Sequence, residues 1–144
     1  MKYSVSVEIE KPLEEVVSLF DNRDNYKHWM EGLLNLILLE GESGQTGAKS
    51  EYTFKMGKGE MKMVETVTSN NLPDEYAVSY TAKGVSNTVV SRFSAISANR
   101  TKYTTENEFQ FSGFMKIIAF LMPGSFKKQS LKYLTDFKKF AEQA

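Results

Sequence analysis

The feature that most constrains the fold is a long stretch of alternating polar and apolar residues, from about position 33 to position 111. Alternation with a period of two is typical of strands that bury one face of a sheet. Short segments rich in glycine, asparagine and proline divide the stretch into six strands. Strands joined by such short turns run antiparallel. The stretch therefore predicts an antiparallel meander with one apolar face.

Helices and one further strand are predicted outside this meander. Residues 3–9 alternate and predict the first strand, and Pro12 opens a helix with apolar side chains at helical spacing. A turn at 21–23 leads to a second short helix, for which Asp24 is the expected N-cap. Residues 126–141 carry an apolar stripe flanked by lysines, which predicts a long C-terminal helix.

Together these elements predict an α+β fold with a single domain over residues 1–144. A seven-stranded antiparallel curved sheet would wrap around the long C-terminal helix, with two short helices between strands 1 and 2. The helix is the only element long enough to cover the apolar face of the sheet. A curved sheet around one helix leaves an internal space, which is where a ligand would fit.

Composition excludes several kinds of chemistry. The chain has no cysteine and one histidine, so it has no disulfide, no thiolate nucleophile and no site of several Cys or His ligands. We therefore expect no metal and no cofactor. The formal net charge is zero, which disfavours nucleic acid as a partner. His28, beside Trp29, is interpreted as a partly exposed helix residue rather than a general base.

No signal peptide and no membrane span is expected. The N-terminus alternates instead of forming an apolar run, and the most apolar window, 114–122, contains Lys116 and is shorter than the roughly 20 residues that a span needs. We therefore expect a cytoplasmic protein without stable membrane insertion.

The order of elements and one local pattern resemble a known superfamily. Residues 7–21 contain a strand, Pro12, a helix and Asp21, followed by Tyr26 and Trp29 in the second helix. This opening, together with the C-terminal helix, resembles the SRPBCC or START-like (helix-grip) superfamily, in its polyketide cyclase/dehydrase-like branch. The resemblance implies a hydrophobic cavity that binds lipids, sterols, polyketides or isoprenoid-like molecules. Relatives include carriers, receptors, enzymes and co-chaperones, and no catalytic motif can be transferred.

Inward-facing positions of the strands and helix give the candidate ligand-binding residues. On the strand that begins at Ser86 we choose the register that keeps Arg92 outside. The candidates are Tyr52, Phe54, Met56, Met61, Met63, Glu65, Val78, Tyr80, Val89, Ser91, Phe93, Tyr103, Thr105, Asn107, Phe109, Met115, Ile118, Met122 and Leu134.

Two of these candidates are polar groups on otherwise apolar faces. Glu65 and Asn107 require hydrogen-bond partners if they line the cavity. Glu65 is then also a candidate for proton transfer. The alternative places Glu65 at the open end of the sheet, in solvent. The tyrosines, including Tyr76, could orient a polar group of a ligand or pack with their hydroxyls in water.

Residues 113–124 are apolar on all sides, unlike an ordinary surface helix. The segment is interpreted as a lid over the cavity, a transient contact with a membrane, or an interface in a homodimer. The alternative is a buried helix start.

The first functional hypothesis is binding or transport of a hydrophobic small molecule in the internal cavity. The second is a cyclase or dehydratase-like enzyme that uses Glu65 or a tyrosine for proton transfer. The third is a co-chaperone-like protein-binding adaptor, which would contain neither ligand nor cavity.

Overall fold

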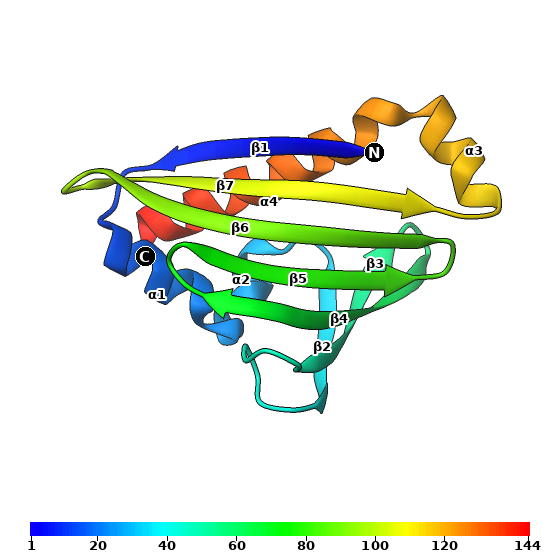
Figure 1. The fold of residues 1–144 in the computed structure, drawn as a ribbon, viewed down its shortest axis with the longest axis horizontal. Coiled ribbons are helices and arrows are strands. Elements are labelled where there is room, and N and C mark those ends of the chain that lie inside the picture. Colours follow the sequence, from blue (N-terminus) through cyan, green and yellow to red (C-terminus); the bar gives the residue numbers. More distant parts are fainter.

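The computed structural model describes all 144 residues and has the elements of an α+β fold (Figure 1). A 3₁₀ turn, Arg23–Asn25, joins the first two helices. The helices and strands are β1 (Lys2–Ile9), α1 (Leu13–Asp21), α2 (Tyr26–Trp29), β2 (Leu33–Glu40), β3 (Lys49–Met56), β4 (Gly59–Asn71), β5 (Glu75–Ala82), β6 (Val85–Ser97), β7 (Arg100–Phe111), α3 (Phe114–Leu121) and α4 (Pro123–Gln143).

The strands form one antiparallel sheet of seven strands in the order β1-β7-β6-β5-β4-β3-β2. Strands β2 to β7 make the predicted meander, and β1 joins its far edge by pairing Ile9 with Thr101 and Lys2 with Glu108. The long helix α4 lies along the sheet near β1 and β7 (Figure 1). The predicted fold class, strand number and two short helices between the first strands are confirmed.

A cluster of aromatic rings fills one half of the space between sheet and helices. Phe20 of α1 lies at its centre, 4.8 Å from Phe93 and 5.9 Å from Phe137 between ring centroids. Trp29 of α2 packs 5.0 Å from the Phe137 ring on α4. The apolar stripes predicted for the helices therefore meet on the sheet, and the register chosen for β6 is confirmed because Phe93 is buried while Arg92 is exposed.

The turn between α1 and α2 differs from the sequence prediction. Asp24 is not the N-cap of α2, which is Asn25, but lies in the 3₁₀ turn, where its backbone N–H donates to the Asn22 side chain at 3.0 Å. This bond starts the 3₁₀ turn and delays the helix until Tyr26. The side chain that caps this turn is therefore that of Asn22, the residue just before it.

Strand β2 is apolar in sequence but lies at the edge of the sheet. Leu34, Ile37, Leu38 and Leu39 are exposed, while Leu36 is half-buried against the core. Two irregularities in the pairing with β3 bend the strand. Bulges of this kind are one way in which natural proteins prevent an edge strand from pairing with another chain.

The chain breaks between α3 and α4, as the Pro123-Gly124 dipeptide predicts. Pro123 is the first residue of α4, where its missing N–H has no cost. Within α3 only Ala119 is buried, so the alternative of a buried helix start at 113–124 is wrong. None of the helices combines the length and apolar character that a bilayer crossing requires.

Candidate ligand-binding cavity

A cavity of about 370 Å³ lies between the concave face of the sheet and the helices. It occupies the half of the interior that the aromatic cluster leaves open. Of its 28 lining residues 21 are hydrophobic, and the polar ones are concentrated on β4 to β7 and on one side of α4. The cavity is therefore an apolar chamber with a few polar groups at defined positions, which is the usual composition of a small-molecule site.

Most of the predicted residues line this cavity. The residues on its wall are Tyr52, Phe54, Met56, Met61, Met63, Glu65, Val78, Tyr80, Val89, Ser91, Tyr103, Thr105, Asn107, Phe109, Met115 and Leu134. Alternation along each strand brings them together, because every second side chain of a strand points to the same face.

Three predicted residues lie outside the lining. Phe93 is buried, but it is stacked 4.5 Å from the Tyr103 ring and belongs to the solid aromatic cluster. Ile118 and Met122 lie on or just beyond α3, of which only Met115 reaches the cavity. Met122 is 53% exposed, because the chain turns outward at the Pro123 break.

The helices contribute lining residues that were not predicted. From the first two helices these are Phe20, Tyr26, Trp29 and Met30, and from α4 they are Phe126, Gln129, Ser130 and Tyr133. The sheet adds Ala82, Val85 and Asn87, and also Tyr76, which was expected only as a tyrosine that could orient a polar group of a ligand. The apolar stripe of α4 was a usable signal. The α1 and α2 residues were assigned only to packing, since helical spacing does not distinguish a cavity wall from a filled core.

Glu65 lies in the interior and is fully paired. Its side chain is 2% exposed, so the alternative of a solvated position at the open end of the sheet is wrong. The Arg23 guanidinium lies 2.6 Å from its Oε1 atom, and the hydroxyls of Tyr52 and Tyr80 donate to its Oε2 atom at 2.8 and 3.0 Å. Four side chains from three strands and the α1–α2 connection thus form one polar cluster.

Arg23 was predicted only as part of a turn, yet it organises this cluster. Its guanidinium also donates to the Tyr76 hydroxyl at 3.1 Å and, more weakly, to the Ser50 and Tyr52 hydroxyls at 3.4 Å. A signal did exist, because a buried carboxylate requires a partner and arginine offers five donors. Nothing in the local sequence identified which cation that would be.

The cluster keeps its tyrosines protonated. Burial, followed by the negative charge of Glu65, raises the pKa of Tyr52 and of Tyr80 well above the ordinary value. Burial works against the charge of Arg23, but the neighbouring Tyr52 and Glu65 outweigh it and raise the pKa of the guanidinium. Glu65 accepts hydrogen bonds from Arg23, Tyr52 and Tyr80, and it therefore holds these three side chains in place.

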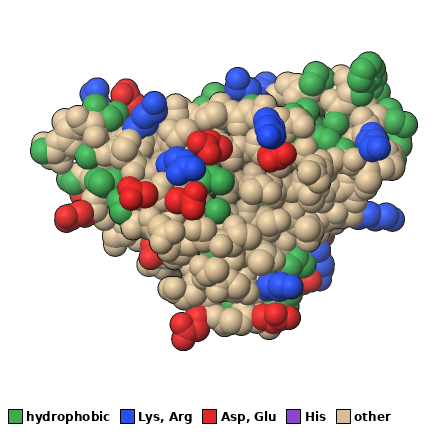
Figure 2. All heavy atoms as spheres, in the orientation of Figure 1, with side chains coloured by type: hydrophobic (Ala, Val, Ile, Leu, Met, Phe, Trp, Pro, Cys, Tyr) green, Lys and Arg blue, Asp and Glu red, His purple; other side chains and the backbone are tan.

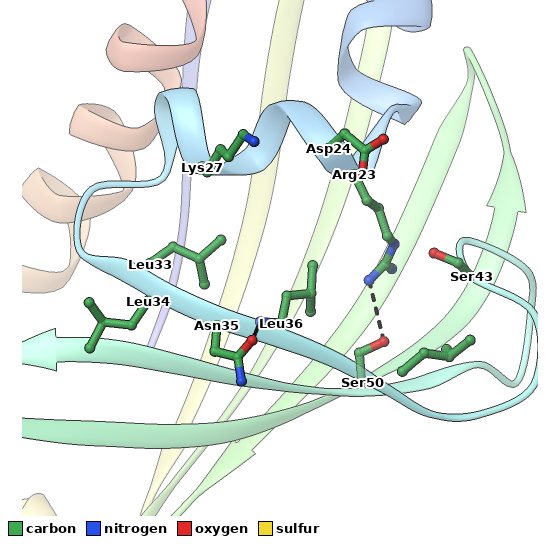
Figure 3. A pocket seen from close by; sticks show the side chains of 10 residues that line it. Arg23, Asp24, Lys27, Leu33, Leu34, Asn35, Leu36, Ser43 and Ser50 are labelled. Atoms are coloured by element: carbon green, nitrogen blue, oxygen red, sulfur yellow. Dashed lines mark hydrogen bonds between the residues drawn. The ribbon is translucent and has the colours of Figure 1, made fainter.

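A second, outer pocket lies on the other side of Arg23 (Figure 3). Its volume is about 360 Å³, and it lies between the α1–α2 connection, strand β2 and the loop after β2. Figure 3 shows Arg23 reaching Ser50 from above, with Lys27 and Asp24 on the helical side and the leucines of β2 opposite. Because the Arg23 guanidinium touches lining residues of both spaces, the polar cluster lies between the outer pocket and the internal cavity.

Two asparagines add polar groups to the wall of the internal cavity. The Asn107 amide donates to the Thr105 hydroxyl at 3.0 Å within β7. The Asn87 Oδ1 atom of β6 is buried without a hydrogen-bond partner. A buried acceptor left unpaired costs roughly 1–3 kcal/mol. A ligand with a hydrogen-bond donor would remove that cost.

The only histidine takes no part in the cavity. His28 is exposed on α2 and stacks on the Phe140 ring of α4 with 5.7 Å between ring centroids. Its interpretation as a surface helix residue is confirmed.

No family model and no curated protein matches the sequence. Solved structures match over nearly the whole chain. The Zhui aromatase/cyclase from Streptomyces sp. R1128 has a TM-score of 0.80 at 13% identity, covering 99% of this chain and 94% of that chain. A conserved protein from Geobacillus kaustophilus has a TM-score of 0.79 at 18% identity, covering 99% and 96%. This chain has the helix-grip fold.

A third helix-grip structure was solved with small molecules bound. Norcoclaurine synthase from Thalictrum flavum, in complex with dopamine and hydroxybenzaldehyde, has a TM-score of 0.72 at 14% identity and covers 99% of this chain and 87% of that chain. The resemblance predicted from residues 7–29 is thus confirmed at the level of the fold. At such low sequence identities, structural similarity shows a shared fold but does not show a shared activity.

Proposed function

We propose that the protein binds or transports a hydrophobic small molecule in the internal cavity. The observation that carries this proposal is the apolar chamber of about 370 Å³ in an otherwise packed interior. Core cavities of this kind cost a folded protein free energy in proportion to their volume, on the order of several kcal/mol at this size. An apolar guest would recover part of that cost through burial, at roughly 25 cal/mol per Å² of surface removed from water.

The distribution of polar groups indicates the orientation of the guest. One end of the cavity is lined by Glu65, which is paired with Arg23, and by the tyrosines around it, and the other end is lined by methionines. Methionine side chains adapt to irregular apolar shapes. The proposed ligand is therefore an apolar molecule, with its hydrophobic end at Met56, Met61 and Met115 and a hydrogen-bond donor near Asn87.

The direct test is to release and identify what the protein carries. The purified protein is denatured in organic solvent, and the extract is analysed by mass spectrometry beside an extract of a variant with a filled cavity. Val89→Phe places a ring in the cavity, whereas Val90→Phe on the same strand points to the opposite face. We expect the wild type and Val90→Phe to release the same apolar compound and Val89→Phe to release little of it.

A fluorescent apolar probe gives a quantitative version of the test. 8-Anilinonaphthalene-1-sulfonate should bind the delipidated wild type and Val90→Phe with similar affinity, and Val89→Phe about tenfold more weakly or worse, because a buried ring removes the contacts that hold the probe. Equal affinity for all three proteins, with no compound released from any of them, would overturn the proposal.

A second candidate is a cyclase or dehydratase-like enzyme, favoured by the likeness to the Zhui aromatase/cyclase. The Glu65→Gln variant separates the two functions, because the amide keeps an acceptor for Tyr52 and Tyr80 but cannot exchange a proton. A carrier retains its affinity for the extracted compound, and an enzyme loses turnover of it. The adaptor alternative has less support, because it predicted that no cavity would be present.

A further inference from the structure

Helix α3 is apolar on two sides, and only one of them has a partner. The inner side carries Met115, which lines the cavity, and Ala119, which is buried. The outer side carries residues that are spaced by three or four positions and lie in solvent: Phe114 is 71% exposed, Ile117 54%, Phe120 84% and Leu121 67%. Figure 2 shows hydrophobic side chains gathered at the end of the molecule where α3 lies.

The surroundings of this outer face are basic. Between Glu108 and Asp136 the sequence has no acidic residue, although the whole chain has zero net charge. The stretch has four exposed lysines. Lys132 is paired with Glu31 and Asp136, whereas Lys116, Lys127 and Lys128 form no ion pair with a carboxylate of the chain. An exposed apolar helix face beside unpaired lysines is the composition of helices that lie in a lipid interface.

The face also lies beside the end of the cavity. A Cβ atom added to Gly84, in the β5–β6 turn, would lie 2.9 Å from Met115 Cγ, so α3 lies directly over that turn. Lys83, in the same turn, is another exposed lysine without an ion pair. Met56 lines the cavity and is 60% exposed, which shows that the lining meets solvent at the methionine end.

We propose that the outer face of α3 docks on an anionic lipid surface, with Phe114, Ile117 and Phe120 in the interface and Lys116, Lys127 and Lys128 against the headgroups. A second copy of the chain is a poorer occupant, because two such faces would bring six unpaired lysines together. Anionic headgroups neutralise the same charges. Docking in this orientation places the methionine end of the cavity against the lipid.

The test is co-sedimentation with vesicles of phosphatidylcholine alone and of phosphatidylcholine mixed with phosphatidylglycerol. We expect the wild type to bind the mixed vesicles at least about tenfold more tightly, since each lysine near an anionic surface contributes favourably. Phe120→Ser should weaken this binding about tenfold. The control is Leu39→Ser, which also replaces an exposed apolar side chain by serine, but on β2. It should leave binding to the mixed vesicles unchanged.

A second pair of variants tests the charges. Lys127→Gln/Lys128→Gln should weaken binding to mixed vesicles about tenfold or more. Lys102→Gln/Lys139→Gln removes two lysines from the β6–β7 end of the molecule and should have little effect. Val89→Phe should bind vesicles like the wild type, so failure of the cavity proposal is distinguishable from failure of this one.

Three outcomes would overturn the proposal: equal binding to both vesicle types, no binding to either, or wild-type binding by Phe120→Ser. So would a dimer in analytical ultracentrifugation that Phe120→Ser dissociates, because the face would then belong to a second copy of the chain.

Discussion

At the scale of single residues, the interior depends on one ion pair. Arg23 and Glu65 are 42 positions apart in sequence, and their side chains are 13% and 2% exposed. Transfer of both charges from water is costly, and the attraction between them is supported by hydrogen bonds to the Tyr52, Tyr76 and Tyr80 hydroxyls, although the buried Arg23 Nε atom has no partner. Removal of one partner leaves the other charge buried and unpaired, which makes the pair a sensitive position.

Arg23→Met should lower the free energy of unfolding by about 3–5 kcal/mol, the usual result of breaking a buried pair. The control is Arg92→Met, which breaks exposed pairs with Glu106 and Glu75 and should change the free energy of unfolding far less, because solvent screens exposed charges. Urea unfolding followed by circular dichroism measures both.

A double-mutant cycle tests whether the loss of stability comes from the interaction between Arg23 and Glu65. Arg23→Met combined with Glu65→Gln should cost less than the sum of the two single variants, by about 1–3 kcal/mol, because the double variant leaves no buried charge. Additive costs would show that Arg23 and Glu65 do not interact in the folded protein.

At the scale of elements, the position of α3 depends on its close contact with the β5–β6 turn. Its outer side is free, so its place over the sheet depends on the contact of Met115 with the β5–β6 turn. Gly84 has a φ of +78° and leaves no room for a side chain, since an added Cβ atom would lie 2.9 Å from Met115 Cγ and 3.3 Å from the Ser112 carbonyl oxygen. The absence of a side chain at Gly84 is thus what allows α3 to pack there.

Gly84→Ala should destabilise the protein more than Gly57→Ala. Both glycines have positive φ, which costs an alanine about 1–2 kcal/mol, but nothing lies within 4 Å of an added Cβ atom at Gly57. The crowding at Gly84 should add about 1 kcal/mol or more. Equal unfolding free energies in urea would mean that α3 does not pack on this turn in solution.

At the scale of the whole molecule, the interior consists of a solid half and a hollow half. The solid half contains the rings around Phe20, where the distance between the Phe93 and Tyr103 ring centroids is 4.5 Å. The hollow half is the cavity, with flexible methionines on its walls. Rigid rings therefore anchor the fold at one end, while the other end can adapt to a guest.

Stability should fall in alkaline solution. Burial raises the pKa of all seven tyrosines above the ordinary 10.0, most strongly for Tyr26, Tyr52, Tyr80 and Tyr103. The unfolded chain loses these protons first, so the stabilisation is complete below pH 10 and decreases as the pH rises above it. Urea unfolding at about pH 8 and about pH 11, with tyrosinate absorbance as a second signal, measures the decrease. Unchanged stability together with early tyrosinate absorbance would contradict it.

The sequence alone determined the architecture. Alternation over 33–111, the turns between the strands and the apolar stripe of the last helix are local patterns, and each predicts the element that the structure contains. The same alternation placed Tyr52, Glu65 and Asn107 on the inner face. Local patterns are sufficient here because strand periodicity and short turns together allow few topologies.

Only the tertiary structure decided which side chains meet and what remains unfilled. Nothing near Arg23 in the sequence indicates that its guanidinium reaches Glu65, and the exposure of Leu34 and Phe120 follows from the edge position of β2 and the outward placement of α3. The cavity volume depends on how far the curved sheet stands from α4. These are properties of distances between elements, and a one-dimensional pattern records the direction of a side chain but not the distance to its neighbour.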